Sequence, residues 1–345
     1  MNIGMLTRWN VPCGVGVHAE LVGRAWVNMG HKVKIFAPIE WKDPYLDSDE
    51  PYVVRCYGED EAGNKFLDEQ PFLKEDFDIF VVQTMIMPYR ELRGVYPKIK
   101  EKAKTVFVIH DEWLDENLTW FDPDAVVCFD ERYKRFLTKT IPEDKIHIIP
   151  YPCHPVKRGD KKVARRKLKL PLDKRIIFNF GNNIFRHIHL LPPLEHLYQR
   201  YPFILLTVTW SNDWFELFEA LKGRYSFIEL RNELPPIDLL YTYLHASDAL
   251  LIHKDSALGV AVASVVYQCL GSGCPIVVHD VNFFETLQDE VIKYGDFKAL
   301  SNMLESIFQE KEEVKQTIKK ALAYAEANSG QEIAKKFLHL FESFY

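Results

Sequence analysis

The chain has 345 residues, of which 47% are hydrophobic and 27% are charged, and it contains 16 Gly and 19 Pro. This apolar fraction excludes a disordered chain, and the small number of glycines and prolines excludes a collagen-like or low-complexity one. Its 43 basic and 49 acidic residues give a net charge of −6. This balance argues against a protein that coats nucleic acid. The length suits about two domains.

Short apolar runs alternate with helical patterns in the first half of the chain. Runs rich in Val and Ile are typical of parallel strands buried on both faces, which need crossover connections that are often helical. The expected strands span residues 3–7, 33–37, 52–56, 79–83, 105–109, 125–129 and 146–149, with helices over 18–29, 89–104 and 130–139. We therefore predict a Rossmann-like α/β domain over residues 1–150.

Residues 150–155 interrupt this rhythm, because three prolines in six residues continue neither a helix nor a central strand. A second set of expected strands follows at 176–180, 203–209, 226–230, 249–253 and 275–278, and helices at 296–308, 310–327 and 331–344. The pattern predicts a second Rossmann-like domain over residues 151–330.

Residues 157–169 carry eight Lys or Arg and one Asp. Such a stretch is usually a solvated linker and helix face, and contact with an anionic membrane or a polyanion is the alternative. The six cysteines are scattered singly, without the spacing of a disulfide framework or a zinc site. The first residues enter a strand-like run without a basic segment, so we expect a cytoplasmic protein with no signal peptide.

Residues 8–18, RWNVPCGVGVH, lie between the first expected strand and the first expected helix. Gly14 and Gly16 let the backbone approach a ligand, and free amides at the helix start favour an anionic or highly hydroxylated ligand. A tight turn explains the two glycines equally well. The loop is not a GxGxxG motif, which argues against a dinucleotide.

From this point the chain resembles a known family. The segment TRWNVPCGVGVHAELVGRAWVNMGHKVKIFAP is similar to the opening of retaining GT-B glycosyltransferases of the glycosyltransferase 4 family. FNFG at 178–181 with Arg186 and His187, ASDALLI at 246–252 and GSGCPIVV at 271–278 are similar to later segments of that family, in the same order.

The resemblance implies an α/β GT-B fold, with two Rossmann-like parallel-sheet domains that face each other across a cleft. It also implies that residues 331–345 form a helix that packs back on the N-terminal domain. The implied reaction transfers a hexose from a nucleoside diphosphate sugar to a hydroxyl acceptor with retention of anomeric configuration. In the family, a His at the end of a strand in the first domain contacts the donor sugar, and His110 matches it.

The chain departs from the family in lacking the characteristic pair of glutamates eight positions apart. Gln268 stands at the second glutamate, which typically holds the donor ribose. The region of the first reads Ser-x-x-Gly-Val from Ser256, in which the Gly259 and Val260 amides at a helix start would bind diphosphate. After Gly181, Asn182 replaces the usual Arg.

A departing nucleoside diphosphate develops two to three negative charges, which cations, metal ions or helix amides can stabilise. No Asp-x-Asp motif lies in a suitable loop. We therefore expect Arg186, Lys254 and backbone amides to do this, with no metal and no other cofactor.

The strand at 105–109 ends at His110-Asp111-Glu112. His110 is suited to orient a sugar hydroxyl or the phosphate, and Asp111 or Glu112 to fix its tautomer or to accept the proton of the acceptor. Asp111 as a helix cap is the structural alternative for that acid. Further residues are expected near the ligands: Trp9, Asn10, His18 and Tyr89 on the acceptor side and Asn232 near the base.

Two other functions suit the same fold. A sugar-nucleotide epimerase would need an acidic pair in the cleft. A nucleotide-sugar-binding or scaffold protein would follow from loss of the glutamates.

Overall fold

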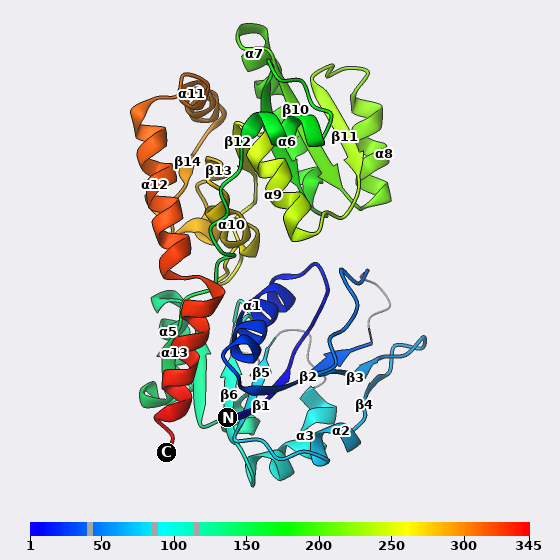
Figure 1. Ribbon diagram of the computed structural model, residues 1–345, viewed down its shortest axis with the longest axis vertical. Coiled ribbons are helices and arrows are strands. Elements are labelled where there is room, and N and C mark those ends of the chain that lie inside the picture. The colour runs from blue at the N-terminus through cyan, green and yellow to red at the C-terminus, as the bar shows by residue number, and fades with distance from the viewer. Residues whose placement is uncertain (40–43, 85–88, 114–117) are drawn as a thin grey trace. The chain divides into compact units, whose positions relative to one another are not determined.

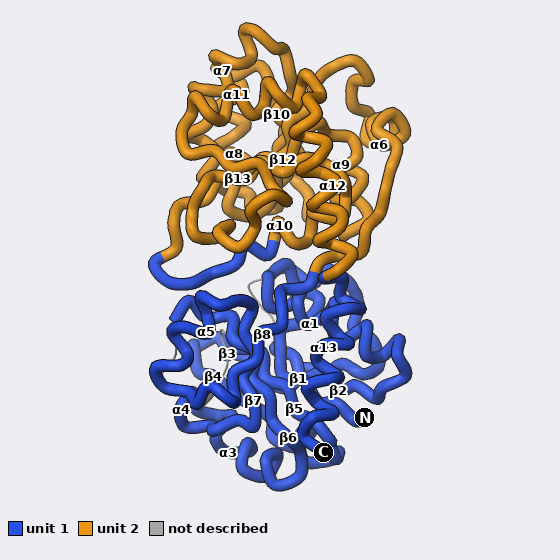
Figure 2. Tube along the Cα trace, turned by 90° about the vertical axis from the view of Figure 1, so that its left-hand side faces the viewer, with its two compact units in different colours: residues 1–152, 258–264, 328–345 blue, residues 153–257, 265–327 orange. Residues whose placement is uncertain are grey.

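The computed structural model describes residues 1–39, 44–84, 89–113 and 118–345, and Figure 1 shows its helices and strands. The described chain divides into two compact units (Figure 2). Unit 1 contains residues 1–152, 258–264 and 328–345, and unit 2 contains residues 153–257 and 265–327. The chain first passes from unit 1 to unit 2 between Pro152 and Cys153, in the proline-rich stretch.

Unit 1 is built on an eight-stranded sheet in the order β4-β3-β2-β1-β5-β6-β7-β8. All neighbouring strands are parallel except the antiparallel pair of β3 and β4. The strands are β1 (Asn2–Leu6), β2 (Lys32–Pro38), β3 (Val53–Glu59), β4 (Lys65–Leu67), β5 (Ile79–Gln83), β6 (Lys104–Val108), β7 (Ala125–Cys128) and β8 (Ile146–Ile148). The helices are α1 (Gly14–Asn28), α2 (Gln70–Leu73), α3 (Tyr89–Lys100), α4 (Leu118–Phe121), α5 (Glu131–Leu137), the 3-10 helix η1 (Glu143–Lys145) and α13 (Gly330–Glu342).

The C-terminal helix α13 packs on α1 within unit 1, as Figure 1 also shows. The indole Nε1 of Trp26 donates a hydrogen bond of 3.2 Å to the Ala334 carbonyl, and the ring meets Phe337 edge-on at 5.8 Å. Gly330 lies where a Cβ would stand 2.9 Å from the Leu21 carbonyl oxygen. The helix therefore begins on a glycine because α1 passes too close for a larger residue.

Unit 2 is built on a six-stranded sheet in the order β11-β10-β9-β12-β13-β14, in which every pair is parallel. The strands are β9 (Arg175–Phe180), β10 (Phe203–Thr209), β11 (Ile228–Asn232), β12 (Ala249–Ile252), β13 (Ile276–His279) and β14 (Ile292–Tyr294). The helices are α6 (Lys161–Lys167), α7 (Leu191–Arg200), α8 (Asn212–Leu221), α9 (Ile237–Ala246), α10 (Ser264–Cys269), α11 (Phe297–Phe308), α12 (Glu312–Ala327) and the 3-10 helices η2 (Ile184–Leu190), η3 (Leu270–Ser272) and η4 (Asn282–Phe284).

The basic stretch that precedes β9 contains α6, and two of its cations serve the fold. Arg165 is buried, with its Nη2 2.9 Å from Asp248 Oδ2, and Lys161 Nζ lies 2.7 Å from the other oxygen of that carboxylate. None of the helices in the described ranges is long and apolar enough to cross a bilayer.

The expectation of two Rossmann-like parallel-sheet domains is confirmed. Two three-residue strands were not expected, the edge strands β4 and β14, and β11 begins two residues later than predicted. A short edge strand carries too little apolar pattern to stand out in a sequence.

Candidate functional site

In each sheet, the strand order changes direction at one place, and ligands of open α/β sheets bind outside the carboxyl ends of the strands at such a point. In unit 1 this place lies between β1 and β5, and in unit 2 between β9 and β12. Gln83 ends β5, and Gly181 and His253 directly follow β9 and β12.

In unit 1, Gln83 joins two buried histidines. Its amide Nε2 lies 3.1 Å from Nδ1 of His18 on α1, and its Oε1 lies 2.6 Å from Nε2 of His110, just beyond β6. The two imidazole rings meet edge to face with centroids 5.1 Å apart. The Thr84 hydroxyl accepts a 2.9 Å hydrogen bond from the His110 backbone N–H, which fixes the backbone as well.

Both histidines are neutral, because burial disfavours the charged imidazolium. Burial lowers the pKa of His18 to about 3. Burial, together with the nearby His18, holds the pKa of His110 well below its ordinary value. The side chain that meets His110 Nε2 is Gln83, where Asp111 or Glu112 was expected to fix the tautomer. Their other expected role, accepting the proton of the acceptor, stays a prediction.

Three residues expected on the acceptor side are buried instead. Trp9 and His18 are fully buried, and Asn10 is 1% exposed. Trp9 Nε1 donates to Glu50 Oε2 at 2.8 Å, and the Asn10 side chain accepts a hydrogen bond from Arg24 Nη2 at 2.9 Å. The prediction that they face an acceptor is wrong, since Trp9 and Asn10 are engaged in the packing of the loop after β1 and His18 on α1 is engaged with Gln83.

Gly14 and Gly16, which were expected in that loop, lie in the first turn of α1, and packing accounts for both. Helix α1 begins at Gly14, and the Cys13 sulfur accepts a hydrogen bond from the Gly16 backbone N–H at 3.3 Å. A Cβ on Gly14 would stand 2.9 Å from the Ser264 hydroxyl, and a Cβ on Gly16 would stand 3.1 Å from the Val11 carbonyl. Tyr89 opens α3, but its side chain lies outside the described residues.

The predicted diphosphate amides of Gly259 and Val260 lie in a segment that belongs to unit 1. Gly259 N–H points to Glu112 Oε2 at 3.4 Å, and Val260 N–H donates to the Glu112 carbonyl at 3.0 Å. Helix α10 begins only at Ser264, so their predicted place at a helix N-terminus is wrong. The contact with Glu112 holds the segment out of the helix, and it requires glycine, since a Cβ on Gly259 would stand 2.3 Å from that carbonyl.

In unit 2, η2 carries Arg186 over the carboxyl end of the sheet. Gly181 follows β9 with a φ of +119°, a conformation that favours glycine, and a Cβ there would meet nothing within 4 Å. The prolines at 192 and 193 stand in the first turn of α7, where a missing N–H leaves no helix hydrogen bond unmade. Residues 184–190 before them form the 3-10 helix η2. His187 fastens η2 to β12, with its Nε2 3.1 Å from the Leu251 carbonyl and 3.2 Å from the His253 backbone nitrogen.

Arg186 forms an ion pair with Asp255, in the segment after β12. Next to this pair, His253, His279 and Tyr294 stack as three parallel rings at the ends of β12, β13 and β14, and His253 and His279 are 4.6 Å apart. Burial lowers the pKa of His253 to about 4, with further contributions that include His279 and Arg186.

The residues of this second cluster are far apart in the sequence. Lys254 follows His253 directly, and its carbonyl lies 2.8 Å from Nδ1 of His279. Because Arg186 on η2 pairs with Asp255, it lies beside the loop that carries Lys254, whose Nζ is 4.5 Å from the centre of the Phe283 ring. His253, His279 and Tyr294 were not expected at the site. Their signal in the sequence is a polar or aromatic residue at the end of an apolar strand.

Three other predicted donor residues, Asn182, Ser256 and Asn232, lie at or after the carboxyl ends of strands of unit 2, whereas Gln268 lies on α10. Asn182 and Ser256 are exposed, and Asn232 ends β11 with its amide 3.2 Å from Asn212 Oδ1. Gln268 is half-buried on α10, and its carbonyl accepts a hydrogen bond from Tyr241 at 3.2 Å. Among the described residues, no group of three or more His, Cys, Asp or Glu is placed to hold a metal ion.

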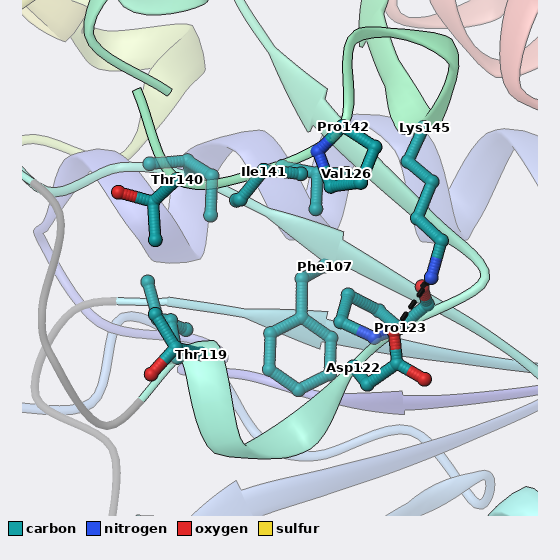
Figure 3. Close-up of a pocket in the computed structure, with 11 residues that line it drawn as sticks. Phe107, Thr119, Asp122, Pro123, Val126, Thr140, Ile141, Pro142 and Lys145 are labelled. Atoms are coloured by element: carbon teal, nitrogen blue, oxygen red, sulfur yellow. Dashed lines mark hydrogen bonds and ion pairs between the residues drawn. The ribbon is translucent and has the colours of Figure 1, made fainter. Parts of the chain in front are cut away.

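A pocket of ≈ 90 Å³ lies elsewhere in unit 1 and contains none of the predicted site residues (Figure 3). Phe107 and Val126 from two neighbouring strands face it, and the Asp122–Lys145 ion pair of 2.6 Å closes one side. Small-molecule sites typically enclose about 300 Å³ or more. The pocket is therefore too small for a nucleotide sugar.

No protein-family model matches the chain. Among solved structures, sucrose-phosphate synthase from Thermosynechococcus elongatus has 15% sequence identity over 100% of this chain and 99% of its own, with a TM-score of 0.70. A glycosyltransferase from Rickettsia africae has 14% identity over 99% and 98%, with a TM-score of 0.74. Anabaena HepE in complex with UDP-glucose has 13% identity over 99% and 100%, with a TM-score of 0.72. The chain thus has the GT-B fold, with two Rossmann-like parallel-sheet units.

Proposed function

We propose that the protein is a glycosyltransferase that moves a hexose from a nucleoside diphosphate sugar to a hydroxyl acceptor, with retention of anomeric configuration. The observation that carries the proposal is the cluster of Arg186, Lys254 and two histidines at the carboxyl ends of β9, β12 and β13. It is supported by a fold shared with Anabaena HepE, whose structure holds UDP-glucose.

The diphosphate is the part of the donor that the unit 2 cluster suits best. Arg186 presents a planar guanidinium that can bind phosphate oxygens in pairs, and Lys254 adds a second positive charge. Gly181 leaves open space beside the backbone at the end of β9. In the proposed reaction these groups, and no metal ion or other cofactor, stabilise the charge that develops on the departing diphosphate.

Retention follows in the proposal from attack on the same face of the sugar that the diphosphate leaves. The bond from the anomeric carbon to the phosphate oxygen breaks, the acceptor oxygen bonds to that carbon, and the departing phosphate takes the acceptor's proton. His110 stays neutral in this scheme and orients a sugar hydroxyl. The acceptor then needs no enzymic base of its own.

The test incubates the full chain with UDP-, ADP-, GDP- and dTDP-linked hexoses and a panel of hydroxyl acceptors, with and without EDTA. The expected result is a glycoside whose anomeric proton coupling matches that of the donor, formed at an equal rate in EDTA. An inverted anomer refutes retention, and a rate that collapses in EDTA refutes the metal-independent scheme. Arg186→Gln is the matched loss-of-charge control.

A second candidate is a protein that binds a nucleotide sugar without turnover. It is favoured by the pairing of the Gly259 and Val260 amides with Glu112 and by Gln268 in place of a glutamate. Calorimetric titration with the same donors separates the two. Binding that is unchanged in His110→Ala, with no product from any acceptor, supports the second candidate.

A further inference from the structure

We propose that Gln83 is a positioning residue that holds His110 as the Nε2–H tautomer, so that His110 Nδ1 offers a lone pair to a hydroxyl of the ligand. The identity of that ligand rests on the proposed function. The tautomer does not, because every contact that sets it lies within unit 1 of the free protein.

The orientation of the Gln83 amide is the first step. Its Nε2 lies between two acceptors, His18 Nδ1 at 3.1 Å and the Met5 sulfur at 3.5 Å. A reversed amide would place its oxygen against the sulfur, which has no proton to donate. The Met5 contact therefore favours the orientation in which Oε1 faces His110. An amide oxygen only accepts, so the Nε2 atom of His110, 2.6 Å away, carries the proton.

In this orientation His18 accepts the hydrogen bond of the Gln83 amide. Its ring is fully buried against Phe129, Tyr151 and Phe337, with centroids 5.4 to 6.0 Å away. Its Nε2 has no hydrogen-bond partner. The neutral ring accepts from Gln83 at Nδ1 and carries its own proton at Nε2. The two hydrogen bonds therefore point the same way: His110 beyond β6 donates to Gln83, and Gln83 donates to His18 on α1.

The consequence concerns what His110 can recognise. An imidazole whose Nε2–H is already donated to Gln83 has only the Nδ1 lone pair left, so it accepts a hydrogen bond from a hydroxyl and cannot donate one to a carbonyl or a phosphate. Gln83 need not touch the ligand. It nevertheless decides that His110 accepts, and the ligand donates, in the hydrogen bond between them. A sugar hydroxyl is a suitable donor for it.

The first experiment records long-range ¹H–¹⁵N spectra of the ligand-free full chain labelled with ¹⁵N-histidine. Peaks of His18 and His110 are assigned from their absence in the His18→Phe and His110→Phe variants. The expected result is an Nε2–H pattern for both residues. An Nδ1–H pattern for His110 would overturn the proposal, and this outcome needs no Gln83 variant to fold.

The second experiment replaces the amide by an apolar side chain of similar size, Gln83→Met. The ratio of Nε2–H to Nδ1–H at His110 should fall by at least about fivefold, the effect of losing one neutral hydrogen bond. An unchanged ratio in the folded variant would overturn the proposal. The matched control is Tyr96→Phe, which removes a buried 2.9 Å hydrogen bond to Thr105 in the same unit and should leave the ratio unchanged.

A third arm uses nucleotide sugars in which single hydroxyls are replaced by fluorine, which accepts but does not donate. The wild type should lose at least about fivefold in affinity at one position, and the Gln83→Met variant should lose less there. If the tautomer is as proposed but no nucleotide sugar binds, the proposed function fails and the role of Gln83 stands.

Discussion

Arg186 on η2 is paired with Asp255 in the segment that follows β12. The guanidinium is about one-third exposed and the carboxylate about three-quarters exposed. An exposed pair of this kind contributes little to stability. It does hold the cation of η2 beside the loop that carries Lys254. An anionic ligand that binds Arg186 has to displace this carboxylate.

The first prediction follows from this competition. Asp255→Asn removes the competing charge, so UDP should bind about threefold to tenfold more tightly, whereas Arg186→Gln should weaken binding by about tenfold or more. Isothermal titration calorimetry at low and high salt measures both. Equal affinity of the wild type and Arg186→Gln for UDP would refute a role for Arg186 in diphosphate binding.

His110 is expected to act on the sugar and not on the diphosphate. His110→Ala should therefore lower kcat by about 100-fold or more, with an affinity for UDP within about twofold of the wild type. Steady-state kinetics and titration with UDP give the two numbers. A variant that loses UDP binding in the same proportion as kcat would contradict this division of roles.

Acid pH should destabilise unit 1 because His18 is buried in its neutral form. Its pKa is lowered from 6.5 to about 3, so below pH 6.5 the unfolded chain binds a proton that the folded chain does not. The stabilisation is complete above the unfolded pKa and is lost as the pH falls towards 3. Between pH 7 and pH 5 the loss is about 2 kcal/mol for this one residue.

Thermal unfolding of the wild type and of His18→Asn at pH 7 and pH 5 tests this contribution. The variant is less stable at pH 7 because a core ring is lost, but its Tm should fall less between the two pH values. The matched control is His196→Asn on the surface of α7 in unit 2. Its Tm should fall between pH 7 and pH 5 by as much as that of the wild type. An identical fall in wild type and His18→Asn would show that His18 is not the group responsible.

The two sheets could be predicted from the sequence because runs of Val and Ile are characteristic of buried parallel strands. It also places Arg186, Lys254 and His110 after strands, and strand ends are where an α/β fold binds its ligands. The role of Gln83 was not predictable in this way. Its partners are Met5 on β1, His18 on α1 and His110 just beyond β6. Which strands lie beside β5 is decided by the sheet and not by the local sequence.

The wrong predictions have a common physical origin. Trp9, Asn10 and the Gly259–Val260 amides are polar groups in loops, and a loop with free polar groups resembles a binding site in sequence. In the folded chain, Glu50, Arg24 and Glu112 use those groups as structural partners. Buried polar groups need such partners. Several of these partners lie about 40 to 150 positions away in the sequence, so local sequence does not reveal them.

Gly181 offers a test of the backbone at the end of β9. Its φ of +119° is strained for any L side chain, although no atom lies within 4 Å of an added Cβ. Gly181→Ala should therefore destabilise unit 2 by about 1–3 kcal/mol through strain alone. The control Gly223→Ala, where a Cβ approaches nothing nearer than 3.9 Å and no strained φ is involved, should change stability by no more than about 0.5 kcal/mol.

The packing of α13 on α1 gives the last prediction. Phe337 is fully buried against Trp26 and His18, so Phe337→Ala leaves a cavity and should lower the free energy of unfolding of unit 1 by about 3–5 kcal/mol. Leu258→Ala truncates a side chain that is 98% exposed in the same unit and should change it by less than about 0.5 kcal/mol. Urea unfolding followed by tryptophan fluorescence compares the two. If Phe337→Ala unfolds at the same urea concentration as Leu258→Ala, the packing of α13 on α1 and His18 does not stabilise unit 1.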